Sequence, residues 1–209
     1  MSFDRKVQLL VIGDAAVGKT SILQRFAQDK FSPQYLATLG IDFFTKDVMI
    51  DKEIIHIKIW DTAGEERYRS LTKGFFKNGE GILIVFDITN KNSFESLKFW
   101  IDSIENNNNL ENKKMPAVIL GNKIDISDRE IDMVQAEEFA KSKNYKYFEV
   151  SAKTGKGVDE SIKYLIQKVI EVVDKDKKRY KNLKIENDDN DKDNNKIKKT
   201  KDDCCSNKK

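Results

Sequence analysis

The segment GDAAVGKT, residues 13 to 20, restricts the possible folds of this chain more than any other feature of its sequence. It follows the apolar run KVQLLVI (6 to 12), and after it apolar residues recur at helical spacing. A GxxxxGK[ST] pattern between a buried strand and a helix cradles phosphate groups with backbone N–H groups at the N-terminus of the helix. The pattern predicts that Lys19 contacts phosphates and that Thr20 holds magnesium.

Strand-like and helical patterns alternate along the rest of the chain, which predicts an α/β fold with a mostly parallel sheet and helices on both faces. Six strands are predicted, at 6–12, 43–50, 54–60, 81–88, 117–122 and 147–152. Five helices are predicted, including one through Ile22, Leu23 and Phe26, one from Ser93 to about Asn106, one from about Asp132 to Lys143 and one from Val158. The short DKE link joins the second and third strands as a hairpin.

The length and composition suit one domain with a polar appendage. With 209 residues, 39% of them hydrophobic, the chain can build a single core. We predict this domain over residues 1–173 and, over 174–209, the end of the last helix and a disordered, slightly basic tail. The net charge of +3 is small, so we expect no nucleic-acid partner. Because we find neither a run of about 18 apolar residues nor a signal peptide, we expect a location in the cytosol or facing it.

Kinases, ATPases and GTPases all use a phosphate loop, so the residues that read the base decide between these classes. GNKID ends a predicted strand, and its Asp125 can accept both N–H bonds of the guanine Watson–Crick edge while Asn122 and Lys123 brace the base and the loops. SAK (151 to 153) also follows a strand, and the N–H of Ala152 can donate to the guanine carbonyl. Adenine offers Asp125 no such pair of donors, so the motifs indicate guanine, with discrimination of about 10⁴ to 10⁵.

Two further residues complete a predicted magnesium and γ-phosphate site at the carboxyl ends of the strands, where open α/β sheets bind their ligands. WDTAG ends the third strand and places Asp61 to hold magnesium through water and the N–H of Gly64 to contact the γ-phosphate. Thr38, before the second strand, can offer its hydroxyl and carbonyl oxygens to magnesium and γ-phosphate. We expect both segments to be ordered only with GTP bound.

Four segments narrow the choice of family: LGIDF (39 to 43), KIWDTAG (58 to 64), RYRS (67 to 70) and IVFDIT (84 to 89). With them, about residues 5 to 173 and the C-terminus resemble the Rab family of the Ras superfamily. The resemblance implies a single GTP-binding domain with strand order 2-3-1-4-5-6 and an antiparallel second strand. It also implies a GDP/GTP switch that recruits effectors to membranes in vesicle trafficking, and ITNKNSF (88 to 94) leans towards the secretory branch.

The resemblance assigns more residues to the site. Phe31 matches the aromatic residue that packs against guanine, and the effector surface matches Ile41, Phe43, Trp60 and Phe75. The predicted nucleotide contacts are Gly13, Asp14, Ala15, Ala16, Val17, Gly18, Lys19, Thr20, Ser21, Phe31, Tyr35, Thr38, Gly64, Asn122, Lys123, Asp125, Ser151, Ala152 and Lys153. From the residues alone, Phe43 and Trp60 fit core packing as well as an interaction surface, and the resemblance favours the surface.

The resemblance also implies a cofactor and partners. The cofactor is Mg²⁺, and the ligands are GTP and GDP. The protein partners are a guanine-nucleotide exchange factor, a GTPase-activating protein, effectors, a GDP-dissociation inhibitor and a Rab escort protein.

Glu65 departs from the family pattern, which has a glutamine directly after DTAG that orients the attacking water. A carboxylate cannot donate to the transition-state oxygens, and its charge opposes the γ-phosphate. Two unit charges about 5 Å apart repel by roughly 3 kcal/mol at an effective dielectric near 20, or about 100-fold in rate. We predict a GTPase with Glu65, Lys19 and Gly64 as catalytic residues. The alternative is a slowly hydrolysing, mainly GTP-bound scaffold, and a P-loop kinase or ATPase is a third reading.

Cys204 and Cys205 are adjacent and lie in the predicted tail, so they cannot form the framework of a disulfide-stapled fold. The pair resembles the double-cysteine site of Rab geranylgeranylation, although the four residues SNKK that follow it make a longer ending than most Rabs have. The resemblance implies two prenyl groups that anchor the chain to the cytoplasmic face of an intracellular or plasma membrane, with a cytosolic pool. Idle thiols and a vicinal disulfide are the alternatives.

Overall fold

The computed structural model describes residues 4–34, 38, 41–62, 79–111 and 115–176. Residues 1–169 form one compact unit. Several predicted site residues lie outside the described residues, namely Tyr35, Gly64, Glu65, Phe75, Cys204 and Cys205. The predicted disordered tail also lies almost wholly outside them, so the predicted domain boundary at residue 173 stays a prediction.

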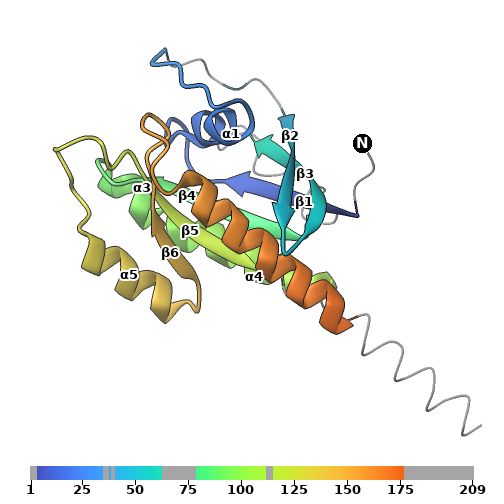
Figure 1. The fold of residues 1–209 in the computed structure, drawn as a ribbon. Coiled ribbons are helices and arrows are strands. Elements are labelled where there is room, and N and C mark those ends of the chain that lie inside the picture. The colour runs from blue at the N-terminus through green and yellow to red at the C-terminus, as the bar shows by residue number, and fades with distance from the viewer. Residues whose placement is uncertain (1–3, 35–37, 39–40, 63–78, 112–114, 177–209) are drawn as a thin grey trace, which may run out of the picture. The chain divides into compact units, whose positions relative to one another are not determined.

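Six strands form one sheet in the order β2-β3-β1-β4-β5-β6 (Figure 1). The strands are β1 (Arg5–Ile12), β2 (Ile41–Ile50), β3 (Glu53–Thr62), β4 (Gly81–Asp87), β5 (Ala117–Asn122) and β6 (Lys146–Glu149). Every pairing is parallel except that of β2 with β3, which is antiparallel. The predicted strand order and the single antiparallel strand are therefore confirmed.

The β2–β3 hairpin turns through Asp51 and Lys52, which have positive φ angles of 49° and 72°. Two consecutive residues with positive φ form the two-residue turn whose twist matches that of antiparallel strands. The predicted link of three residues is thus one residue shorter in the structure, because Glu53 already pairs with Ile50.

Four helices are labelled in the described part of the chain: α1 (Lys19–Gln28), α3 (Lys91–Glu95), α4 (Leu97–Glu111) and α5 (Met133–Ser142). Four such helices compare with the five predicted, and residues 158–176, which include the start predicted at Val158, are helical without carrying a label. The single helix predicted from residue 93 is divided at Ser96 into α3 and α4. The side chain of Asn90 caps α3 by accepting hydrogen bonds from the N–H groups of Asn92 and Ser93, which moves the helix start towards the strand.

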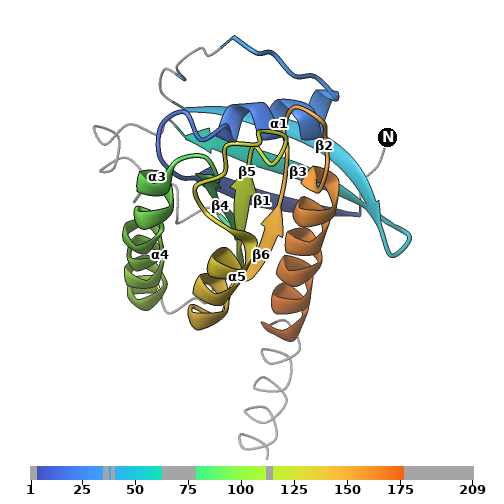
Figure 2. The same cartoon turned by 90° about the vertical axis from the view of Figure 1, so that its left-hand side faces the viewer.

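The helices cover both faces of the sheet, as predicted (Figure 2). One buried cluster joins inward side chains of the central strands, such as Leu10 and Phe86, to side chains of α3, α4 and α5. On the opposite face, a Cβ added to Gly81 would meet Leu9 and two side chains of the 158–176 helix, Leu165 and Val169. Strand β4 is buried along its whole length, which explains why its sequence GILIVFD is apolar up to Asp87 rather than alternating.

The strand register brings polar residues together at the carboxyl edge of the sheet. Val11, near the end of β1, pairs with Asp61 near the end of β3, and Asp87 at the end of β4 pairs with Asn122 at the end of β5. Because β2 is antiparallel, its first residues also lie at this edge, where Ile41 pairs with Thr62. Among the described residues, the segments with predicted site motifs therefore all adjoin this one edge of the sheet.

Candidate functional site

The loop between β1 and α1 has a backbone that only glycine can adopt at two positions. Gly13 has a φ of 141°, and a Cβ there would collide with the carbonyl oxygen of Val85 in β4. Gly18 has a φ of 95°, and a Cβ there would collide with the side-chain amide of Asn122. Both conditions exclude larger residues. The two glycines of the motif therefore let the loop lie directly against the strands and the β5 loop.

The side chain of Lys19, the first residue of α1, bonds to the first two residues of this loop. Its ammonium group donates hydrogen bonds to the carbonyl oxygens of Gly13 at 2.9 Å and Asp14 at 2.7 Å, and the residue is only 6% exposed. Burial lowers the pKa of Lys19 to about 8, and the nearby charges of Asp61 and Asp14 oppose this shift. The loop thus presents a buried cation beside the N-terminus of a helix, which is an arrangement suited to a phosphate anion.

Three oxygen-bearing side chains meet next to the lysine. The hydroxyl of Thr20 donates to Asp61 Oδ2 at 2.6 Å and lies 2.8 Å from the hydroxyl of Thr38. Asp61 is 1% exposed, burial raises its pKa, and its Oδ1 atom is buried with no hydrogen-bond partner among the described residues. Hydroxyl and carboxylate oxygens are the donors that Mg²⁺ takes together with phosphate oxygens and water. The unsatisfied Asp61 Oδ1 therefore fits a magnesium site.

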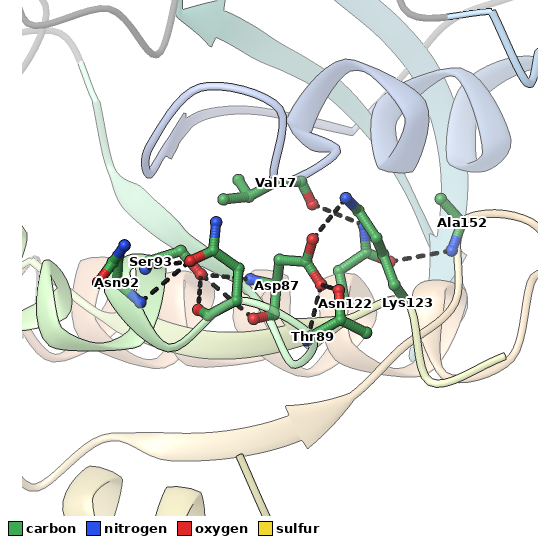
Figure 3. A network of polar contacts seen from close by, with 9 residues as sticks. Val17, Asp87, Thr89, Asn92, Ser93, Asn122, Lys123 and Ala152 are labelled. Atoms are coloured by element: carbon green, nitrogen blue, oxygen red, sulfur yellow. Dashed lines mark hydrogen bonds and ion pairs between the residues drawn. The ribbon is translucent and has the colours of Figure 1, made fainter. Parts of the chain in front are cut away.

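Asn122, at the end of β5, bonds to two loops that come from distant parts of the sequence (Figure 3). It is 1% exposed; its side-chain N–H donates to the carbonyl of Val17 at 2.8 Å, and its Oδ1 accepts from the N–H of Ala152 at 3.1 Å. One amide therefore holds the phosphate loop and the 151–153 loop at the same time. A single side chain with one donor side and one acceptor side fixes the spacing between the two loops.

Asp125 and Lys123, which follow Asn122 in the chain, each bond to a residue of another segment. Asp125 accepts a hydrogen bond from the hydroxyl of Ser151 at 2.6 Å, and Lys153 lies 3.7 Å from its other oxygen. Lys123 has a positive φ of 72°, and its ammonium group pairs with the buried Asp87 at 2.5 Å. These contacts place the Asp125 carboxylate beside the 151–153 loop.

A cleft of about 400 Å³ lies over these groups. It is lined by Ala15, Ala16, Gly18, Lys19, Thr20, Ser21, Gln24, Phe31, Ser32, Pro33, Gln34, Thr38, Asn122, Lys123, Asp125, Ile126, Ala152 and Lys153. Five predicted residues, Gly13, Asp14, Val17, Asp61 and Ser151, are not among the lining residues. All five are nevertheless hydrogen-bonded to residues that line the cleft.

Two residues near the cleft were missed by the sequence analysis. Trp100, in α4, donates from its indole N–H to the carboxylate of Asp14 at 2.9 Å, across 86 positions of sequence. Arg25, in α1, donates to the carbonyl oxygens of Ala152 at 3.0 Å and Lys153 at 2.8 Å. Both residues belong to helices whose patterns read as ordinary core and surface positions. No sequence motif signals either contact, because both depend on distant segments meeting in the fold.

Phe43 and Trp60 are cross-strand neighbours on the β2–β3 hairpin, with ring centroids 5.6 Å apart. Phe43 is 49% exposed, whereas Trp60 is partly buried against the core cluster. The ammonium group of Lys58 lies over both rings, at 4.0 Å from the centroid of Phe43 and 3.9 Å from that of Trp60. Of the two alternatives, core packing and an exposed surface, Phe43 therefore fits the exposed surface. Trp60 is partly exposed and also packs against the core.

The fold and the cleft define a P-loop nucleoside-triphosphate-binding protein. The sequence matches the model of the Ras family over residues 8–171. It is 38% identical over 184 residues to Ras-related protein Rab-27B of Rattus norvegicus, which covers 83% of this chain and 84% of the relative. It is 38% identical over 170 residues to Ras-related protein Rab-13 of the same species, covering 81% and 82%. It is 36% identical over 169 residues to GTP-binding protein ypt2 of Schizosaccharomyces pombe, covering 80% and 83%. The chain belongs to the Ras family and, within it, to the Rab small GTPases.

Nucleotide affinity should depend on pH through Lys19. The pKa of Lys19 is about 8 in the ligand-free cleft, and negatively charged phosphates next to the ammonium group would raise it. Above pH 8 the binding of nucleotide therefore takes up a proton. Affinity for GDP should be full below pH 8 and fall by up to about tenfold per pH unit as the pH rises from 8 towards the pKa of the bound form. Calorimetric titration between pH 7 and 9.5 measures this slope.

The matched variant for this test is Lys19→Gln, which has no titrating group at the position. Its affinity should be lower throughout and show a shallower pH dependence. Because guanine itself loses a proton in alkali, only the difference between the two slopes reports Lys19. Equal slopes would exclude Lys19 as the titrating group.

Proposed function

We propose that this chain is a Rab-type switch that alternates between GDP- and GTP-bound forms, hydrolyses GTP, and recruits effectors to membranes in intracellular vesicle trafficking. The observation that carries the nucleotide part is the double hydrogen bond of Asn122, which joins the phosphate loop to the 151–153 loop in one cleft. The trafficking part is supported by the similarity to the Rab relatives.

Guanine recognition is assigned to Asp125 and Ala152. A carboxylate offers about four lone-pair sites, and Ser151 uses one on Oδ1, which leaves capacity for the two N–H donors of guanine. The single N–H of Ala152 already donates to Asn122 Oδ1, so a guanine carbonyl would have to share this donor or replace that bond. Phe31 lines the same cleft and is positioned to pack against the base.

Asp125→Asn should lower the affinity for GDP at least about 100-fold, because the amide offers one acceptor and one donor where guanine presents two donors. The same amide should improve the binding of xanthosine diphosphate, whose second carbonyl accepts a hydrogen bond. Competition against a fluorescent nucleotide measures both affinities. Asp128→Asn, in the same loop and outside the cleft lining, should leave them unchanged. Unaltered GDP binding in Asp125→Asn would sink the proposed base recognition.

Magnesium is assigned to Thr20, Thr38 and Asp61, on the strength of their converging oxygens and the unsatisfied Asp61 Oδ1. When bound, the ion would neutralise charge on the β- and γ-phosphates. Thr20 and Thr38 come from different segments and their hydroxyl groups already lie 2.8 Å apart, so an ion that contacts both would hold Thr38 beside α1.

Glu65 bears on the hydrolysis half of the enzymatic cycle, because it stands where the family has glutamine. We retain a GTPase with Glu65, Lys19 and Gly64 in the catalytic machinery, and an activating protein can supply a glutamine and an arginine in trans. The second candidate, favoured by Glu65 itself, is a slowly hydrolysing scaffold that stays mainly GTP-bound. Purified protein that carries mostly GDP supports the first, and protein that carries mostly GTP supports the second.

Glu65→Gln should raise the single-turnover rate of GTP hydrolysis, by up to about 100-fold if the repulsion of the γ-phosphate is fully expressed in the barrier. The change removes a negative charge and adds an N–H donor. The neighbouring Glu66→Gln removes the same charge one position later and should have a smaller effect. A rate that stays the same in Glu65→Gln, with and without an activating protein, removes Glu65 from the mechanism.

Membrane attachment is assigned to Cys204 and Cys205, with geranylgeranyl groups added through a Rab escort protein. Among the described residues, the structure contains no helix long and apolar enough to cross a membrane. Effectors, an exchange factor, an activating protein and a GDP-dissociation inhibitor complete the proposed set of partners. Residues 174–209 would act as the tether between the anchor and the domain of residues 1–173.

Intact mass of the protein expressed in a eukaryotic host should show two prenyl groups, because two chains anchor stably where one is marginal. Replacing both Cys204 and Cys205 by serine should remove both groups and release the protein from the membrane fraction. Two unmodified thiols in the unaltered protein would contradict the anchor.

A further inference from the structure

Arg25 makes four hydrogen bonds from one guanidinium group, and two of them reach across to the 151–153 loop. Its Nε donates to the carbonyl of Ala152 at 3.0 Å and one terminal nitrogen to the carbonyl of Lys153 at 2.8 Å. The other terminal nitrogen donates to Asp29, to its carbonyl at 3.1 Å and its carboxylate at 2.8 Å. The side chain is 19% exposed. A planar, charged fork that uses several donors at once has a fixed orientation.

The loop that Arg25 holds is closed on itself. Ser151 and Lys156 are joined by a backbone hydrogen bond of 3.0 Å, and the N–H of Gly155 donates to the carbonyl of Ser151 at 2.8 Å. The N–H of Thr154 donates to the Ser151 hydroxyl at 3.0 Å. Because the loop is tied together internally, a clamp on its Ala152 and Lys153 carbonyls positions the whole loop, including the Ala152 N–H that faces Asn122.

The clamp belongs to the helix that begins at the phosphate loop. Lys19 and Thr20 form the first turn of α1, and Arg25 follows Lys19 by six positions, or about 9 Å along the helix axis. One rigid element therefore contacts the phosphate end of the cleft through its N-terminus and the base end through Arg25. The Asn122 amide makes the second, independent link between the same two ends.

We propose that Arg25 is a positioning residue for the guanine end of the cleft, and that its bonds to the 151–153 loop set the rate at which bound nucleotide is released. The inference rests on the proposed binding of GDP and GTP and goes beyond it. Loss of the clamp lets the loop move away from the base while the phosphate loop, Lys19 and Thr20 keep their contacts. Release accelerates, and chemistry at the γ-phosphate does not change.

Asp29 has a minor part in this arrangement. Its carboxylate is 92% exposed, so its ion pair with Arg25 is screened by water and weakly stabilising. Its backbone carbonyl, which also accepts from Arg25, is present whatever the side chain. Asp29→Asn should therefore change nucleotide release by less than about twofold.

The test compares the release of a fluorescent GDP analogue from full-length unaltered protein, Arg25→Gln, Arg25→Lys and Arg129→Gln, with excess unlabelled GDP as chase. Arg25→Gln should release the analogue about 10- to 100-fold faster, since two charge-assisted bonds to the loop are lost. Arg25→Lys, which keeps the charge but not the fork, should be intermediate. Arg129→Gln removes an arginine of similar exposure that pairs with Glu149 at 2.6 Å outside the cleft lining, and it should behave as unaltered protein.

Two further measurements distinguish positioning of the base loop from a general loss of structure. The single-turnover hydrolysis rate of GTP already bound should be the same in Arg25→Gln and unaltered protein. The affinity for inorganic tripolyphosphate, which lacks the base, should also be the same. A general loosening of the fold would lower that affinity together with the affinity for GDP.

The outcomes separate the inference from the function on which it rests. Unaltered protein that fails to retain GDP overturns the proposed function. Unaltered protein that retains GDP, with release from Arg25→Gln at the same rate, overturns the role of Arg25 alone. Equal losses of GDP and tripolyphosphate affinity in Arg25→Gln overturn it as well. If Arg25→Gln does not fold, Arg25→Lys decides: faster release supports the clamp, and unchanged release contradicts it.

Discussion

The two hydrogen bonds of the Asn122 side chain are the constraint on which the cleft depends. They join the carbonyl of Val17 to the N–H of Ala152, two groups that lie 135 positions apart in the sequence. The amide is buried, so leaving either side unpaired would cost about 1–3 kcal/mol. Gly18 lies so close to this amide that no Cβ fits between them. The packing of the 13–20 loop and its distance from the 151–153 loop are therefore both fixed by this one amide.

The fold could be predicted because local pattern and topology agree. The run AVILGN predicts a strand over residues 117–122, and β5 has these bounds, with its last residue at the carboxyl edge where the motif needs it. Parallel strands with intervening helices then bring Asp61 and Asn122 to that edge without any further information. The division of one predicted helix at Ser96 could not be foreseen, because it depends on how Asn90 caps the first turn.

The site could be predicted where a motif carries its chemistry locally and not where a contact joins distant segments. Lys19 and Thr20 belong to a motif of eight residues. Arg25 contacts residues more than 120 positions away, and Trp100 contacts Asp14 across 86 positions, so only the packed fold reveals them. The exposure of Phe43 was ambiguous for a related reason: alternation along a strand shows which residues share a face, and not which face is covered.

Lys19 and Asp61 are opposite charges that folding removes from water, and neither has its full set of partners from the described residues. Burial lowers the pKa of the lysine to about 8 and raises that of the aspartate, and one aspartate oxygen has no hydrogen bond. Removing charges from water opposes folding unless a counter-ion compensates for it. A ligand that binds only the folded form stabilises it in proportion to the logarithm of its concentration. The folding stability of this chain is therefore partly a property of the solution around it, and under the proposed binding of nucleotide and magnesium their cellular supply would set how much of the protein is folded.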